Sequence, residues 1–256
     1  MLKIADKEFS SRFMIGTGKY PDFEIMEKAH SASGAEIITV AIRRVDIGAP
    51  GHVGLMNHID LNKYWILPNT ASCATAEEAI RIAHLSRAMG INNWVKLEVI
   101  PDAKYLLPDP IATFEAAKVL VEEGFVVLPY INADPILAKR LEEIGCATVM
   151  PLASPIGSGQ GVRTLDNIKI IIENSNIPVI VDAGLGTPSD AAIAMENGAD
   201  ACLLNTAVAL AKNPEKMALA FKLGIEAGRV AYEAGRIPVK EIASASSPLI
   251  GVVGKS

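Results

Sequence analysis

Short apolar runs recur along the chain, and each is followed by a polar loop and then by the signals of a helix start. The runs have the length and the Ile, Val and Leu content of buried strands. Interpreted as strands, they are Phe13–Gly16, Ile37–Ala41, Tyr64–Pro68, Trp94–Val99, Val126–Ile131, Thr148–Pro151, Val179–Asp182 and Ala201–Leu204. A chain that alternates strands and helices in this way favours a parallel sheet covered by helices.

Helix-capping residues lie between the runs. Thr75 and Glu78 have capping-box spacing, and Asp109–Pro110 and Asp134–Pro135 each place an N-cap before a proline at the first helical position. Further helix starts are predicted at Asp22, Thr164 and Thr187, with a long last helix over Pro214–Ala234, and the stop glycines are Gly90, Gly124, Gly145 and Gly198.

Eight successive strand–helix units predict a (β/α)8 TIM barrel. A doubly wound open sheet is the alternative, but it usually has fewer strands. No linker or low-complexity tract divides the sequence, so a single domain over residues 1–256 is expected, with a short N-terminal hairpin in Leu2–Phe9 and an irregular tail from Ala243.

Composition limits the size of the core and the class of partner that this protein can have. Half of the 256 residues are hydrophobic and the mean hydropathy is +0.29, enough for one large core. The net charge of −5 argues against nucleic acid or an anionic membrane as the main partner. With no signal-peptide pattern and no apolar run of membrane-spanning length, a cytoplasmic protein is expected.

The three cysteines show neither a disulfide framework nor a zinc pattern. Cys146 and Cys202 are expected to be small core residues. No cluster of His, Asp and Glu has metal-ligand spacing, so no metal or other cofactor is predicted.

The stretch Trp94–Val99, WVKLEV, carries the first candidate chemistry. As a strand it places Val95, Leu97 and Val99 on one face, and Lys96 and Glu98 on the other, roughly 6.5 Å apart along the strand. A lysine in a site of low dielectric constant can act as an amine nucleophile, with a nearby acid to move protons. The alternative is a buried ion pair that only fills space.

Other unusual residues follow the later strands, whose C-terminal ends form the site of a TIM barrel. Asp182 alternates with Ile180, so both should point inward. Asp182 is either a proton-transfer group, or a helix cap or structural hydrogen-bond acceptor. Glycine backbone and helix N-termini near the last strands favour phosphate binding, and the candidates are Gly157, Gly184, Gly186, Asn205 and Thr206.

Three features carry weaker signals. GTGKY at Gly16–Tyr20 lacks the spacing of a nucleotide-binding P-loop. His52 and His58 are more typical of a loop than of a ligand set. Arg43–Arg44 either reaches the barrel mouth or is solvated.

Many blocks of the chain, taken in order, resemble the thiazole synthases, which build the thiazole phosphate of thiamin. These blocks are GTGKYP (Gly16–Pro21), LPNTA (Leu67–Ala71), TAEEAIRIA (Thr75–Ala83), VKLEVI (Val95–Ile100), LLPDP (Leu106–Pro110), GFVVLPY (Gly124–Tyr130), SPIGSGQG (Ser154–Gly161), PVIVDAGLGTPSDAA (Pro178–Ala192), LLNTAV (Leu203–Val208) and AGRIP (Ala234–Pro238). The loop Arg43–Ile59 departs from this pattern.

The resemblance implies that Lys96 forms an imine with the ketone of 1-deoxy-D-xylulose 5-phosphate. It implies sulfur from a thiocarboxylated sulfur carrier protein, dehydroglycine (2-iminoacetate) from a separate supplying enzyme, and a homo-oligomer, either dimer or tetramer. Glu98 and Asp182 match acid/base positions. The positions that match sugar-phosphate contacts are Gly157, Ala183, Gly184, Asn205 and Thr206.

An imine needs a neutral amine, so we expect burial to lower the pKa of Lys96, opposed by Glu98 if that group is ionised. Two other functions fit the same residues. A Schiff-base aldolase acting on a sugar phosphate would need no protein sulfur donor. A non-catalytic phosphate-binding barrel would bind the sugar phosphate without a covalent adduct.

Overall fold

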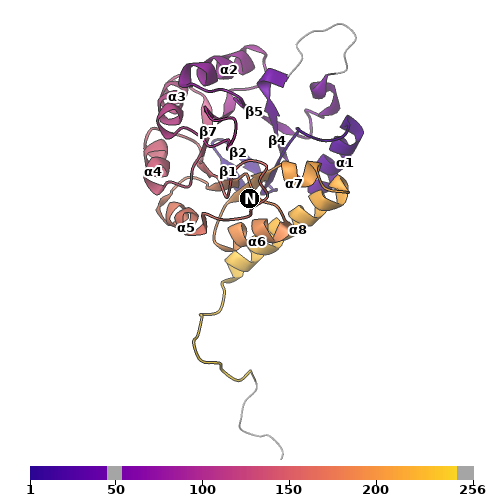
Figure 1. Ribbon diagram of the computed structural model, residues 1–256, viewed down its shortest axis with the longest axis vertical. Helices are drawn as coiled ribbons and strands as arrows, with labels where there is room; N and C mark the ends of the chain where they lie inside the picture. The colour runs from indigo at the N-terminus through magenta and orange to yellow at the C-terminus, as the bar shows by residue number, and fades with distance from the viewer. Residues whose placement is uncertain (45–53, 247–256) are drawn as a thin grey trace, which may run out of the picture.

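The computed structural model describes residues 1–44 and 54–246, and in it a ring of parallel strands is surrounded by helices (Figure 1). The strands of the ring are β3 (Phe13–Gly16), β4 (Ile37–Ala41), β5 (Trp65–Asn69), β6 (Trp94–Leu97), β7 (Val126–Ile131), β8 (Met150–Pro151), β9 (Ile180–Asp182) and β10 (Ala201–Leu204). Their order is β8-β7-β6-β5-β4-β3-β10-β9, and the bridges Val149–Val179 and Leu152–Asp182 join the two end strands. The ring is therefore closed, and the predicted (β/α)8 barrel is confirmed.

The helices cover the outside of the ring (Figure 1). They are α1 (Phe23–Ser33), α2 (Ala76–Ala88), α3 (Pro110–Glu122), α4 (Pro135–Glu143), α5 (Leu165–Asn174), α6 (Pro188–Glu196), α7 (Thr206–Ala209) and α8 (Pro214–Ala234), with 3-10 turns at Ile42–Arg44 and Leu55–His58. The capping predictions are confirmed at Asp22, Asp109 and Asp134, whose carboxylates accept backbone N–H groups of the first turn. Thr164 precedes α5 as predicted, but its hydroxyl donates to the carbonyl of Leu152.

The barrel interior at the N-terminal ends of the strands is filled by apolar side chains. They come from the strands of the ring and from an antiparallel hairpin of β1 (Leu2–Ile4) and β2 (Lys7–Phe9), and include Trp94, Met14, Leu128 and Ile180. Because these side chains fill this end of the barrel, the cavity of the described residues lies toward the C-terminal ends of the strands.

The face assignment of the WVKLEV stretch is confirmed. Val95, Leu97 and Val99 belong to the core between strands and helices, whereas Lys96 and Glu98 face the interior. The strand ends at Leu97 rather than Val99, because the N–H of Glu98 donates to the hydroxyl of Thr70 instead of to a strand carbonyl.

Several smaller predictions can be compared with the described residues. Cys146 and Cys202 are buried and free, as expected of core residues. His52 and the last residues of the tail that begins at Ala243 lie outside the described residues. Among residues 1–44 and 54–246, no helix combines the length and apolarity needed to cross a lipid bilayer.

Candidate active site

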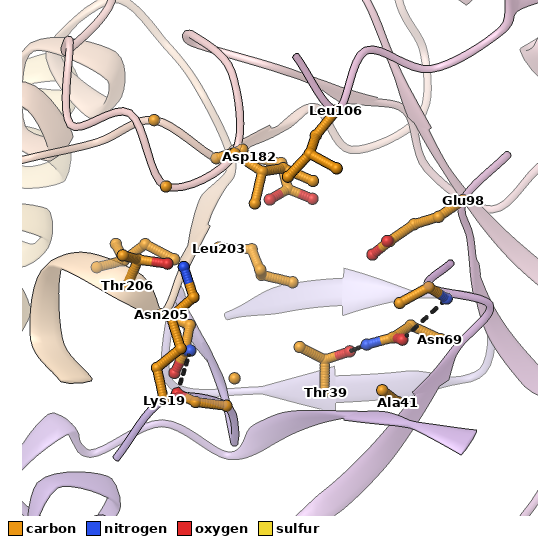
Figure 2. Close-up of a pocket in the computed structure, with 18 of the residues that line it drawn as sticks. Lys19, Thr39, Ala41, Asn69, Glu98, Leu106, Asp182, Leu203, Asn205 and Thr206 are labelled. Carbon is orange, nitrogen blue, oxygen red and sulfur yellow. Dashed lines mark hydrogen bonds between the residues drawn. The ribbon is translucent and has the colours of Figure 1, made fainter. Parts of the chain in front are cut away.

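A cavity of about 800 Å³ opens at the C-terminal ends of the strands (Figure 2). It is lined by all nine of the site residues expected from the sequence: Lys96, Glu98, Gly157, Asp182, Ala183, Gly184, Gly186, Asn205 and Thr206. Residues far apart in sequence are thus brought to one space, at the end of the barrel where this fold carries its active sites.

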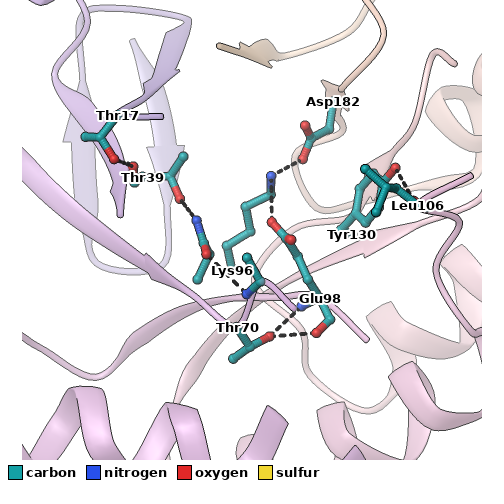
Figure 3. A network of polar contacts seen from close by, with 10 residues as sticks. Thr17, Thr39, Thr70, Lys96, Glu98, Leu106, Tyr130 and Asp182 are labelled. Carbon is teal, nitrogen blue, oxygen red and sulfur yellow. Dashed lines mark hydrogen bonds and ion pairs between the residues drawn. The ribbon is translucent and has the colours of Figure 1, made fainter. Parts of the chain in front are cut away.

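Lys96 lies between two carboxylates (Figure 3). Its Nζ is 2.7 Å from Oδ2 of Asp182 and 3.2 Å from Oε1 of Glu98, and the three side chains are 5%, 3% and 7% exposed in that order. Three ionisable groups buried in contact are costly unless they neutralise one another, and such clusters in a cavity are candidates for proton transfer.

The sequence-based expectation for the pKa of Lys96 is wrong in direction. Burial does lower this pKa, but the charges and hydrogen bonds of Asp182 and Glu98 together outweigh burial and hold it above its usual value. The prediction considered only Glu98, two residues along the strand, and not the closer Asp182. The ammonium must therefore pass a proton to a neighbouring group before the amine can act as a nucleophile.

Asp182 is the carboxylate nearer to the Lys96 ammonium. Burial raises its pKa to about 6, more than the opposing effect of Lys96 can offset. A carboxylate with a pKa near 6 exchanges protons readily close to neutral pH.

Thr70 fixes the backbone of Glu98 and was not singled out by the sequence. Its fully buried hydroxyl accepts the N–H of Glu98 at 2.7 Å and donates to the carbonyl of Glu98 at 2.8 Å (Figure 3). Thr70 is part of the LPNTA block, but a threonine after a strand commonly bonds to nearby backbone, so its role could not be inferred from sequence.

Two more buried polar side chains line the cavity near Lys96. The amide of Asn69 donates to the hydroxyl of Thr39 at 2.9 Å, and Asn69 is paired with Lys96 in the strand register (Figure 2). The pair gives the cavity floor hydrogen-bonding groups in addition to the ionic cluster.

Two glycine-rich loops, one after β8 and one after β9, meet at the side of the cavity opposite Asn69 and Thr39. The N–H of Gly161 donates to the carbonyl of Gly184 at 3.0 Å, and so does the hydroxyl of Ser154 at 3.1 Å. Gly184 has φ +70°, and a Cβ there would lie 2.4 Å from the carbonyl oxygen of Ser154. Only glycine fits this contact.

Backbone donors are available along these loops and at the start of α7. Within the described residues, no hydrogen bond uses the N–H groups of Gly157, Gly184, Asn205 or Thr206. The N–H of Ala183, in contrast, donates to the carbonyl of Leu203. Free backbone N–H groups at a cavity wall and a helix start form a suitable cradle for an anion such as phosphate.

Arg43 and His58, two of the residues with weaker sequence signals, lie away from this chemistry. Arg43 pairs with Glu78 at 3.3 Å, and His58 contacts Glu27 at 2.6 Å; neither cationic residue lines the cavity. In the described part of the chain, no group of three His, Cys, Asp or Glu residues is placed to hold a metal ion.

Comparison with known proteins agrees with this geometry. The family model described as "Thiazole biosynthesis protein ThiG" matches residues 3–248. The thiazole synthase of Acaryochloris marina is 64% identical over 98% of this chain and 93% of its own length. The bifunctional protein ThiO/ThiG of Synechocystis is 62% identical over 99% of this chain, which spans 40% of that longer protein.

Solved structures share the barrel fold. A chain from the crystal structure of the Amycolatopsis orientalis BexX/CysO complex superposes with a TM-score of 0.83 at 34% identity, covering 95% of this chain and 98% of that one. A native KDPGal structure, with a TM-score of 0.59 and 16% identity over 88% and 98% of the two chains, shares the fold alone. The chain therefore belongs to the thiazole synthase family, the enzymes that form the thiazole phosphate of thiamin.

Proposed function

We propose that this enzyme condenses 1-deoxy-D-xylulose 5-phosphate, dehydroglycine and sulfur from a thiocarboxylated carrier protein into thiazole phosphate, through a Schiff base on Lys96. The observation that carries the proposal is the placement of Lys96, buried between two carboxylates in a cavity whose other wall carries free backbone N–H groups.

The first step is formation of the imine. The Lys96 ammonium gives a proton to Asp182, the nearer carboxylate at 2.7 Å, and the neutral amine attacks the ketone carbon of the sugar. A carbon–nitrogen bond forms, the carbonyl oxygen takes up protons, and water leaves. The raised pKa of Asp182 makes this carboxylate a suitable acceptor at neutral pH.

The imine then makes later proton transfers easier. Once protonated, it withdraws electrons from the neighbouring carbon, so a carboxylate can remove a proton there. Glu98 lies on the other side of the Lys96 Nζ from Asp182 (Figure 3). Two carboxylates that flank the amine of Lys96 can act in turn as base and acid during tautomerisation and water loss.

The phosphate is held at the opposite wall. Free N–H groups of Gly157, Gly184 and Thr206 donate to its oxygens, and Ala183 and Asn205 shape the loops around it. A sugar phosphate bound there would extend its ketone toward Lys96, and this fixed orientation favours attack by the amine.

A protein sulfur donor is supported by the structural relative, whose crystal structure contains two proteins, BexX and CysO. We propose that a carrier protein docks at the open end of the barrel and places its C-terminal thiocarboxylate in the cavity. The cavity of about 800 Å³ has room for a substrate together with a short peptide end. Supply of dehydroglycine by a separate enzyme, and assembly as a homo-oligomer, belong to the same proposal.

The experiment is a reconstitution with 1-deoxy-D-xylulose 5-phosphate, dehydroglycine and the carrier protein carrying either a thiocarboxylate or a plain carboxylate at its C-terminus. Mass spectrometry should detect thiazole phosphate only with the thiocarboxylate. The matched Lys96→Arg enzyme, which keeps the positive charge, should give none. Cleavage of a carbon–carbon bond of the sugar without any carrier protein would instead identify an aldolase.

A further inference from the structure

The GTGKY segment at Gly16–Tyr20 has no part in the chemistry above, although Gly16, Thr17, Gly18 and Lys19 all line the cavity. The segment joins β3 to α1 and is fastened at two points. The side-chain amide of Asn205 donates to the carbonyl of Gly18 at 2.6 Å, and the hydroxyl of Thr17 donates to the carbonyl of Thr39 at 3.3 Å. The loop is therefore fixed against the strand ends that form the site.

Gly16 shows how close this contact is. A Cβ at Gly16 would lie 2.8 Å from the Cβ of Asn205, so the loop can approach the end of β10 only because this residue is glycine. Lys19, near the end of the segment, has φ +69°, which is uncommon for residues other than glycine, asparagine and aspartate. Such strain is typical of positions where a side chain must be aimed.

The side chain of Lys19 is directed to the phosphate cradle. Its Nζ is 3.4 Å from the position that a Cβ on Gly157 would occupy, and the Thr206 hydroxyl is 3.6 Å from the same position. Figure 2 shows Lys19 beside Asn205 and Thr206, across the cavity from Glu98. In residues 1–44 and 54–246, no salt bridge or hydrogen bond engages this ammonium group.

The charges that line the cavity also favour a cation at this wall. Among the described residues, four charged side chains line the cavity: Lys19, Lys96, Glu98 and Asp182. Lys96 is already paired with both carboxylates, which would repel a phosphate dianion. Lys19 is thus the cation left to balance a phosphate group.

We propose that Lys19 binds the phosphate of the substrate and sets the preference of this enzyme for phosphorylated over unphosphorylated sugars. Its ammonium donates to phosphate oxygens that also accept the backbone N–H groups of the cradle. The assignment rests on the proposed function, in which the substrate is a sugar phosphate.

The test compares wild type with Lys19→Met, which keeps the side-chain length but removes the charge, and with Lys19→Arg, which keeps the charge. Lys118→Met, on the exposed face of α3, is the matched control for loss of a surface lysine. Calorimetry measures the affinity for inorganic phosphate. Borohydride trapping measures adduct formation with 1-deoxy-D-xylulose 5-phosphate and with 1-deoxy-D-xylulose.

Loss of one charge-assisted hydrogen bond should weaken phosphate affinity by about 10- to 100-fold in Lys19→Met and reduce the preference for the phosphorylated sugar by a similar factor. Lys19→Arg should stay within about threefold of wild type, as should Lys118→Met. Thermal melting shows whether Lys19→Met is folded.

Phosphate affinity in folded Lys19→Met equal to that of wild type would overturn the assignment, even if wild type forms the adduct normally. A different result would refute the proposed function: wild-type enzyme that forms no adduct with the phosphorylated ketose. If phosphate affinity still falls in Lys19→Met, Lys19 remains the phosphate-binding residue of a barrel with another chemistry.

Discussion

Replacement of Gly184 by alanine should damage the fold and the cradle together, and the structure allows its cost to be separated into two parts. The first part is the backbone: a residue with a Cβ at φ +70° pays about 1–2 kcal/mol. The second part is space. The new Cβ would lie 1.9 Å from the Ser154 hydroxyl oxygen and 2.4 Å from its carbonyl oxygen.

The hydroxyl can rotate away, but the carbonyl belongs to the backbone of the loop after β8 and can only move with that loop. Forced movement of well-packed structure typically costs about 1–3 kcal/mol. The sum is a loss of roughly 2–5 kcal/mol in the free energy of unfolding, against a total of about 5–15 kcal/mol for a typical protein.

Gly90→Ala is the matched control. Gly90 has almost the same backbone angle, φ +74°, but nothing lies within 4 Å of the position of its Cβ. It should therefore show only the backbone cost of about 1–2 kcal/mol. Urea unfolding of wild type and both variants, analysed with a common slope, gives the two differences. Equal losses in the two variants would refute the close contact between Gly184 and Ser154 as the reason for glycine.

Two further predictions concern the carboxylates. Asp182 has a pKa raised to about 6 and must be ionised to take the Lys96 proton. Borohydride-trapped adduct should therefore form faster as the pH rises through about 6, and Asp182→Asn should lack this rise. An unchanged pH profile in the variant would show that Asp182 does not accept the proton. Thr70→Val should lose about 1–3 kcal/mol of stability and most turnover, because the N–H and carbonyl of Glu98 lose their buried partner, whereas Thr70→Ser should keep both. Urea unfolding and product assays measure these effects, and wild-type behaviour of Thr70→Val would show that Glu98 needs no such support.

Much of the barrel could be predicted because its local signals agree with its tertiary structure. The apolar runs of the buried strands and the caps at Asp109 and Asp134 identified strands and helices close to their observed ends. The four-residue helix α7, Thr206–Ala209, was missed because a single turn has no hydrophobic period. Strand β8 is shorter than predicted, since Val149 makes only an isolated bridge to Val179.

The site could be predicted as a set of residues but not as a set of contacts. The alternation of side chains along the strands predicted that Lys96 and Asp182 point into the barrel. Their direct contact, however, depends on how β6 and β9 face each other across the ring. That contact reverses the expected pKa shift of Lys96. Lys19 was set aside because its motif is not a P-loop. The loop is held by hydrogen bonds to Thr39 and Asn205, which the sequence does not reveal.

The central claim is that Lys96 forms the covalent bond to substrate, and one measurement tests it most directly. The enzyme is treated with 1-deoxy-D-xylulose 5-phosphate and borohydride, its intact mass is measured, and the modified peptide is mapped. The account predicts one adduct, on the peptide that contains Lys96. Absence of an adduct while the sugar phosphate still binds, or an adduct on Lys19, the other lysine lining the cavity, would contradict it.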